Sequence, residues 1–199
     1  TIPALQTIIN KAAELDVKEV VIGMAHRGRL NVLSNILGKT YEQIFTEFEG
    51  NVSPEQTMGD GDVKYHLGYS SHINTPSGKK IYLKLTPNPS HLEAVDPLVI
   101  GYTRGQIDDE FKGDLTKGMA ILIHGDAAVA GQGIVYELLQ MSGLPGSSRS
   151  AWTSLVIASA AACGVPSSCS ERRASAISAS LSCWPATGST GALNGRSTS

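Results

Sequence analysis

The sequence predicts one α/β domain with a mainly parallel sheet, followed by a tail of different composition. Two observations predict the domain: short apolar runs alternate with segments of helical apolar spacing, and several of these runs end at a glycine or a polar loop. A change of composition near residue 146 predicts the tail. With 199 residues, the chain is long enough for one domain with a core and too short for two large ones.

The first part of the chain alternates between helical and strand-like patterns. A short β-branched run that ends at Gly23 is typical of a buried parallel strand, and the second helix is expected to end at Gly38. In chain order, we expect a helix over 2–15, a strand over 20–22, a helix over 30–37 and a helix over 41–48.

The second part begins with a long polar segment. Residues 51–79 are rich in Gly, Ser, Pro, Asp and Asn without a long apolar period, which predicts a long loop of the kind that often carries function. After it, we expect a strand over 81–85, a helix over 92–106, a strand over 119–123 and a helix over 134–141.

Overall composition excludes several classes of function. Hydrophobic residues make up 41% of the chain and charged residues 17%, and no apolar run reaches the roughly 18 residues that a membrane span needs. The net charge is only -2 with no basic cluster, which argues against nucleic acid as a partner. The first residues lack both a secretory signal pattern and an initiator Met, so we expect the natural start to lie upstream.

The predicted tail, residues 147–199, differs sharply from the rest. Of its 53 residues, 25 are Ser or Ala, and it contains no Lys, Asp, His, Phe or Tyr, so it has little from which to build a core. Its three cysteines, Cys163, Cys169 and Cys183, have neither the number for a closed disulfide set nor neighbouring His for a zinc site. We therefore predict a disordered tail.

Polar loops follow the predicted strands. Residues 24–29, 88–93 and 124–128 each come after an apolar run, and residues 61–68 lie in the long loop. In an open parallel sheet such loops converge on one edge. They would supply imidazole, guanidinium and carboxylate groups, which suit a phosphorylated, metal-bound cofactor and an anionic substrate.

These four segments resemble those of one enzyme family. GMAHRGRLNVL, GDVKYHLG, NPSHLEAV and IHGDAAVAGQG are similar, in this order, to the E1 component of 2-oxoglutarate dehydrogenase. The resemblance implies that residues 1–146 are part of a transketolase-like domain that binds thiamine diphosphate and Mg²⁺. It also implies oxidative decarboxylation of 2-oxoglutarate, transfer of the succinyl group to the lipoyl group of a partner E2, and a homodimer.

The resemblance assigns cofactor roles to individual residues. Asp126 matches the Mg²⁺ ligand, Ala127 and Ala128 match positions against the cofactor, and Arg27 matches the arginine on the diphosphate. The alternatives are ordinary structural roles: an Asx turn or helix cap for Asp126, and a surface ion pair for Arg27.

The resemblance also implies residues that act on the substrate. His26 and His66 match imidazoles that bind 2-oxoglutarate, and both are expected to be catalytic together with His91. Ser90 matches a position beside the cofactor and the substrate, and Leu92 one beside the cofactor, although core packing would equally explain Leu92. His72 and His124 receive no role, and Gly59-Asp60-Gly61 is rejected as a cofactor motif because no apolar strand precedes it.

The sequence departs from the family where the metal site should be completed. The family has an Asn and a nearby backbone carbonyl about thirty residues after the Gly-Asp pair, whereas this chain has no Asn between that pair and Asn194. We therefore hypothesise that the coding frame or gene assembly changes near codon 146. The chain alone is expected to be inactive.

Two alternatives stay open at this point. A 2-oxoadipate-using relative would share the chemistry with a different pocket, although the pair His26 and His66 favours 2-oxoglutarate. A non-catalytic module that keeps an anion site and uses the Ser-rich tail for partners belongs to another class. The expected compartment is the cytoplasm for a bacterial protein, which is favoured, or the mitochondrial matrix for a eukaryotic one.

Overall fold

The structure is a computed structural model that describes residues 1–49, 66–141 and 156–159. All of these lie in one compact unit, residues 1–161. Side chains are described for residues 1–49 and 66–141, except that of Asp126. Residues 50–65 and most of the predicted tail lie outside the described part, as do the predictions made for them.

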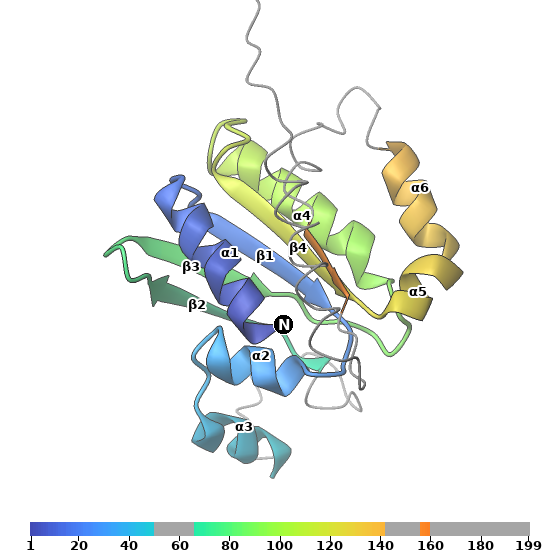
Figure 1. The fold of residues 1–199 in the computed structure, drawn as a ribbon, viewed down its shortest axis with the longest axis horizontal. Helices are drawn as coiled ribbons and strands as arrows, with labels where there is room; N and C mark the ends of the chain where they lie inside the picture. Colours follow the sequence, from blue (N-terminus) through green and yellow to red (C-terminus); the bar gives the residue numbers. More distant parts are fainter. Residues whose placement is uncertain (50–65, 142–155, 160–199) are drawn as a thin grey trace, which may run out of the picture. The chain divides into compact units, whose positions relative to one another are not determined.

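A five-stranded, mainly parallel sheet forms the centre of this unit (Figure 1), which confirms the predicted fold class. Its order is β2-β3-β1-β4-β5, in which β1 pairs in parallel with β3 and β4, and β4 pairs in parallel with β5. Only the edge strand β2 is antiparallel to its neighbour. The strands are β1 (Glu19–Met24), β2 (Tyr69–Asn74), β3 (Lys80–Leu85), β4 (Gly118–His124) and β5 (Val156–Ser159).

Helices lie on both faces of the sheet. In Figure 1, α1 lies in front of the strands and α4 behind them. The helices are α1 (Ile2–Glu14), α2 (Arg29–Asn35), α3 (Tyr41–Phe48), α4 (Val95–Asp109), α5 (Asp126–Gly131) and α6 (Gly133–Met141). No helix among the described residues is long and apolar enough to cross a membrane.

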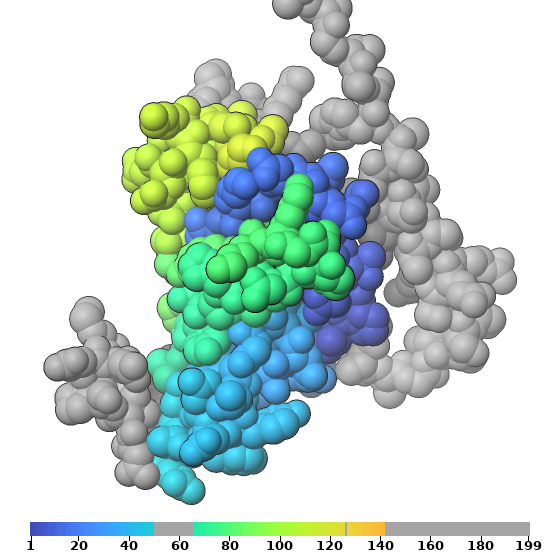
Figure 2. Space-filling view, turned by 90° about the vertical axis from the view of Figure 1, so that its left-hand side faces the viewer, coloured from blue at the N-terminus to red at the C-terminus, as the bar shows by residue number. Residues whose placement is uncertain are grey.

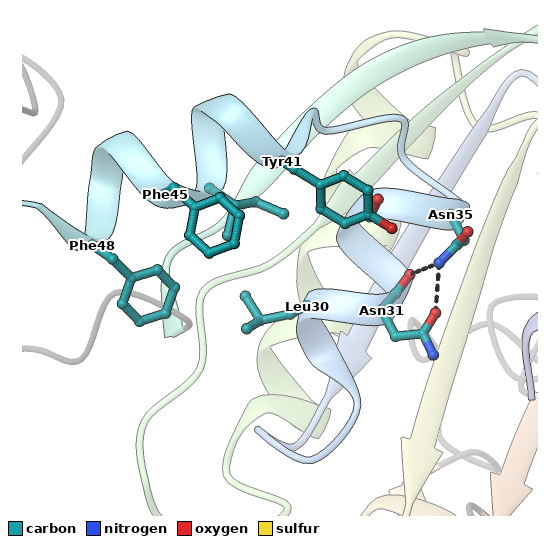
Figure 3. A pocket seen from close by; sticks show the side chains of 8 residues that line it. Leu30, Asn31, Asn35, Tyr41, Phe45 and Phe48 are labelled. Carbon is teal, nitrogen blue, oxygen red and sulfur yellow. Dashed lines mark hydrogen bonds between the residues drawn. The ribbon is translucent and has the colours of Figure 1, made fainter.

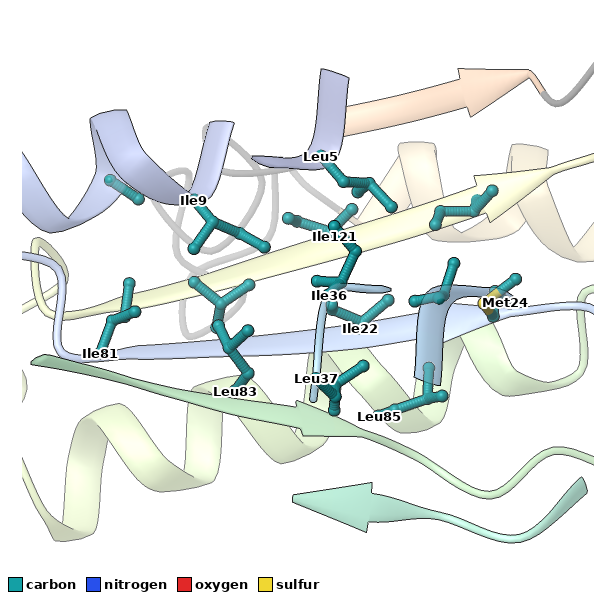
Figure 4. Close-up of a cluster of buried hydrophobic side chains, with 14 of the residues drawn as sticks. Leu5, Ile9, Ile22, Met24, Ile36, Leu37, Ile81, Leu83, Leu85 and Ile121 are labelled. Carbon is teal, nitrogen blue, oxygen red and sulfur yellow. The ribbon is translucent and has the colours of Figure 1, made fainter. Parts of the chain in front are cut away.

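The central strand β1 is buried along its whole length and has apolar side chains on both faces. Ile22 belongs to the larger core cluster, in which Leu5 and Ile9 of α1 pack on the sheet (Figure 4). Val21 belongs to the smaller cluster on the other face, against Val99 of α4. A parallel strand covered on both faces needs such a continuous apolar run, and this is why 20–22 was recognisable in the sequence.

The prediction of a loop over 51–79 is wrong for its second half, because residues 69–74 form β2. Along β2, half-buried and exposed residues alternate, but the sequence YSSHIN has polar residues on both faces. An edge strand needs little apolar surface, so the alternation of apolar and polar residues that identifies a strand in the sequence is weak here. In Figure 2 the β2–β3 hairpin (green) lies at the surface above α2 and α3 (light blue).

Order also extends into the stretch predicted to be a disordered tail. Residues 156–159 form β5 and pair with Ile121 to His124 of β4. The β-branched pair Val156-Ile157 suits a strand that adds to the edge of a parallel sheet. These four residues are thus part of the sheet.

Glycine at position 23 allows α4 to lie close to β1. A Cβ atom built on Gly23 would lie 2.6 Å from Cγ2 of Val99 and 3.0 Å from Cδ2 of Leu122. Both neighbours are fully or almost fully buried, so neither can move away without disturbing the core.

We expect Gly23→Ala to lower the free energy of unfolding by about 1–3 kcal/mol, because the added methyl group overpacks this interface. Gly101→Ala in α4 is the matched control. Its added Cβ meets nothing within 4 Å, and it should stabilise the helix by up to about 1 kcal/mol. Urea denaturation of both variants measures the difference, and equal stability of Gly23→Ala and the unsubstituted chain would contradict the packing argument.

Candidate functional site

The carboxyl ends of β1, β3 and β4 meet at one edge of the sheet, where the chain passes from one side of β1 to the other. The chain enters β3 on one side of β1 and then crosses through α4 to β4 on the other side. Ligands of open α/β sheets bind at such a switch point. The expected site residues follow these strands, apart from His66, which lies just before β2.

Most of these residues are accessible. His26 and Arg27 are exposed in the loop after β1, Ser90 and His91 are exposed in the loop after β3, and Leu92 is half-buried. In α5, Ala127 is exposed and Ala128 is half-buried, and Asp126 is the first residue of this helix. The side chain of Asp126 lies outside the described part, so its predicted contact with Mg²⁺ stays a prediction.

A buried arginine, Arg29, joins the segments that carry these residues. Its guanidinium group donates to the carbonyl oxygens of Leu67 at 2.9 Å and Thr86 at 2.5 Å, with longer contacts to those of Met24 and His66 at 3.4 and 3.5 Å. Burial lowers the pKa of Arg29 to about 10, so the group stays charged at neutral pH. Arg29 therefore fixes the end of β1 against the chain around His66 and the end of β3.

The two imidazoles predicted to bind substrate lie near each other. The ring centroids of His26 and His66 are 6.2 Å apart, and the rings are inclined by 46°. His66 is almost fully buried, and its carbonyl oxygen accepts a hydrogen bond from the backbone N–H of Asn88 at 3.2 Å. The loop that carries Ser90 is thus joined to the backbone of His66.

A second buried group of polar side chains connects β4 to the loop after β3. His124, the last residue of β4, contacts a carboxylate oxygen of Glu93 through Nδ1, and the same nitrogen is 3.7 Å from Asp96. All three side chains are at most 3% exposed. Burial, and after it the neighbouring Glu93, raises the pKa of Asp96 to about 8.

Sequence reasoning missed four of these structural residues: Arg29, Glu93, Asp96 and His124. Arg29 lies in the segment GMAHRGRLNVL, but its sequence context does not distinguish it from a surface arginine. For the other three residues, two sequence patterns point to buried polar roles. Glu93 and Asp96 are three residues apart at the start of a helix, and His124 ends an apolar strand, where a polar residue needs a partner.

A groove between α2 and α3 lies away from these loops (Figure 3). It has a volume of about 430 Å³ and a mostly apolar lining that includes exposed aromatic side chains of α3. Its lining residues are Leu30, Asn31, Ser34, Asn35, Tyr41, Ile44, Phe45 and Phe48. None of the predicted site residues contributes to it.

The fold and this edge define an α/β protein whose candidate ligand site lies at a topological switch point. A family model described as "Dehydrogenase E1 component" matches residues 1–148. The chain therefore belongs to the dehydrogenase E1 component family, which confirms the resemblance inferred from the four segments. The match ends two residues beyond the predicted boundary at 146.

Similar proteins carry names that refer to 2-oxoglutarate. The chain is 53% identical over 149 residues to the multifunctional 2-oxoglutarate metabolism enzyme of Mycobacterium sp. (strain JLS), covering 73% of this chain and 12% of that protein. It is 50% identical over 147 residues to the mitochondrial 2-oxoglutarate dehydrogenase of Saccharomyces cerevisiae, covering 72% of this chain and 14% of that protein. The chain thus spans only a small part of the length of these relatives.

The two neighbouring arginines are expected to respond differently to substitution. Arg29→Met leaves the half-buried carbonyl oxygen of Leu67 and the buried one of Thr86 without the guanidinium donor, so the free energy of unfolding should fall by about 3 kcal/mol. Arg27→Met removes an exposed side chain and should change stability by less than about 0.5 kcal/mol. Thermal and urea denaturation test both values, and similar losses in the two variants would refute this assignment.

Proposed function

We propose that residues 1–146 form one half of the cofactor site of a thiamine-diphosphate-dependent 2-oxoglutarate dehydrogenase E1. The observation that carries the proposal is the convergence of three family segments at the carboxyl ends of β1, β3 and β4. Membership of the dehydrogenase E1 component family and the names of the relatives support the same function.

The residues at this edge fit a cofactor with a diphosphate group and a metal ion. Arg27 lies in the loop after β1 and Asp126 begins α5 directly after β4; β1 and β4 are adjacent strands with Met24 paired to Ile123. An exposed guanidinium group suits a diphosphate, and a carboxylate suits Mg²⁺. In this proposal Arg27 binds the diphosphate, Asp126 binds Mg²⁺, and Ser90, Leu92, Ala127 and Ala128 contact the cofactor.

In this proposal, histidine side chains bind the substrate and transfer protons. When bound, thiamine diphosphate supplies the nucleophilic carbon and the electron sink that decarboxylation of a 2-oxo acid requires. His26 and His66 bind the 2-oxoglutarate carboxylates together with Ser90, and His26, His66 and His91 are the groups available for proton transfer. A 2-oxoadipate-using enzyme is the alternative with the same residues and a different pocket.

The complete reaction needs parts outside this half-site. The proposal includes transfer of the succinyl group to the lipoyl group of an E2 and a homodimeric enzyme, in the cytoplasm of a bacterium or the mitochondrial matrix of a eukaryote. After Asp126 the chain has no Asn before Asn194 to complete the metal site, so we propose that it does not turn over 2-oxoglutarate alone. The change of coding frame near codon 146 remains our hypothesis for residues 147–199.

Titration calorimetry with the 199-residue chain tests the half-site. We expect weak, saturable binding of thiamine diphosphate that depends on Mg²⁺, because one carboxylate and one guanidinium group remain. Arg27→Met should weaken binding about tenfold or more, the equivalent of one charge-assisted contact. Asp126→Asn should remove the dependence on Mg²⁺, and His72→Ala, an exposed residue on β2, is the control.

Each outcome separates the alternatives. Absence of saturable binding by a folded chain would contradict the half-site. Equal affinity for inorganic diphosphate without Mg²⁺ would favour the anion-binding module instead. Detectable 2-oxoglutarate decarboxylation with ferricyanide as electron acceptor would contradict the proposed inactivity of the chain alone.

A further inference from the structure

We propose that Glu93, Asp96 and His124 form a binding site for one divalent transition-metal ion of the zinc class, distinct from the proposed Mg²⁺ site at Asp126. The three side chains come from two elements that the sheet holds in place. His124 ends β4, and the backbone N–H of Asp96 donates to the carbonyl oxygen of Glu93 at 3.1 Å, in the turn that begins α4.

The donor atoms determine the class of ion. One imidazole nitrogen and two carboxylate groups suit Zn²⁺, Co²⁺, Mn²⁺ or Fe²⁺, whereas Mg²⁺ and Ca²⁺ prefer sites made of oxygen alone. The proposed Mg²⁺ site at Asp126 follows the oxygen preference, so the two sites differ in chemistry.

The three side chains are close enough to reach one ion after the carboxylates adjust. The three ligand atoms, one from each side chain, all lie within 4.8 Å of one another. In a tetrahedral zinc site with ligands at roughly 2.1 Å, the ligand atoms are about 3.4 Å apart. The carboxylate of Glu93, which contacts Nδ1 of His124 directly, would therefore move outward by about 1 Å to admit the ion.

One buried oxygen has no partner in the described part of the structure. Glu93 contacts His124 through Oε2, whereas its Oε1 is buried and receives no hydrogen bond from the described residues. A buried acceptor left in this state costs about 1–3 kcal/mol. A bound metal ion would satisfy this oxygen, and this observation points to a ligand independently of the grouping itself.

The electrostatics favour a cation at the same place. Among the described residues, neither Lys nor Arg forms an ion pair with Glu93 or Asp96. Glu93 and Asp96 therefore hold two carboxyl groups together beside His124 without a described basic side chain of Lys or Arg between them. A divalent ion would balance both carboxylates, with His124 as the nitrogen ligand.

Binding of Co²⁺ alone to the full chain, with Cys163, Cys169 and Cys183 replaced by Ser, tests the proposal. Removal of the thiols excludes binding by the tail cysteines. We expect one Co²⁺ per chain, visible ligand-field absorption, and displacement by Zn²⁺. Glu93→Gln and Asp96→Asn should each weaken Co²⁺ binding about tenfold or more, and Asp126→Asn should leave it unchanged.

Two results would overturn the proposal: no saturable Co²⁺ binding by the folded chain, or binding that survives the double variant Glu93→Gln/Asp96→Asn. Loss of Co²⁺ binding in Asp126→Asn would likewise overturn it by assigning the ion to the other site. Should the substituted chains fail to fold, proton NMR of the Cys-free chain with Co²⁺ decides. A hyperfine-shifted imidazole signal from His124 supports the site, and its absence refutes it. The result is independent of thiamine diphosphate binding.

Discussion

The arrangement of the candidate site depends on the buried guanidinium group of Arg29. Carbonyl oxygens are acceptors without a full charge, and four of them from three segments surround this one cation. The segments are far apart in sequence, since they belong to the end of β1, the chain at His66 and the end of β3. A planar group with five donors in fixed directions can join them, whereas an ammonium group could not reach all of them at once.

The burial of Arg29 also explains why Arg27 and Arg29, which are separated by one residue, have different roles. Gly28 lies between them with φ +77°, a left-handed conformation that serves as the N-cap of α2. This turn leaves Arg27 exposed at the edge of the sheet, while Arg29 begins the helix with its side chain fully buried. One short turn thus supplies both a group available to a ligand and the group that organises the surrounding backbone.

The sequence was most informative where a single physical requirement dominates. Burial on both faces made 20–22 and 119–123 recognisable as strands, and the alternation over 81–85 gave the third. It was least informative for the edge strand β2, which relies largely on partners distant in sequence: its Ser71 donates a hydrogen bond to the carbonyl oxygen of Leu37 at 2.7 Å. Such partners lie 34 residues apart and leave no local pattern.

The candidate site shows the same limit for polar residues. Local patterns and the family segments identified residues such as His26 and Ser90, which are exposed and follow strands. They could not identify His124, because its role depends on Glu93, which lies 31 residues earlier in the chain. Only the parallel pairing of β1 with β3 and β4 brings these two ends together. Buried polar groups therefore hold the exposed candidate residues of this edge in place. Arg29 joins the ends of β1 and β3 to the chain at His66, and His124 joins the end of β4 to Glu93 and Asp96.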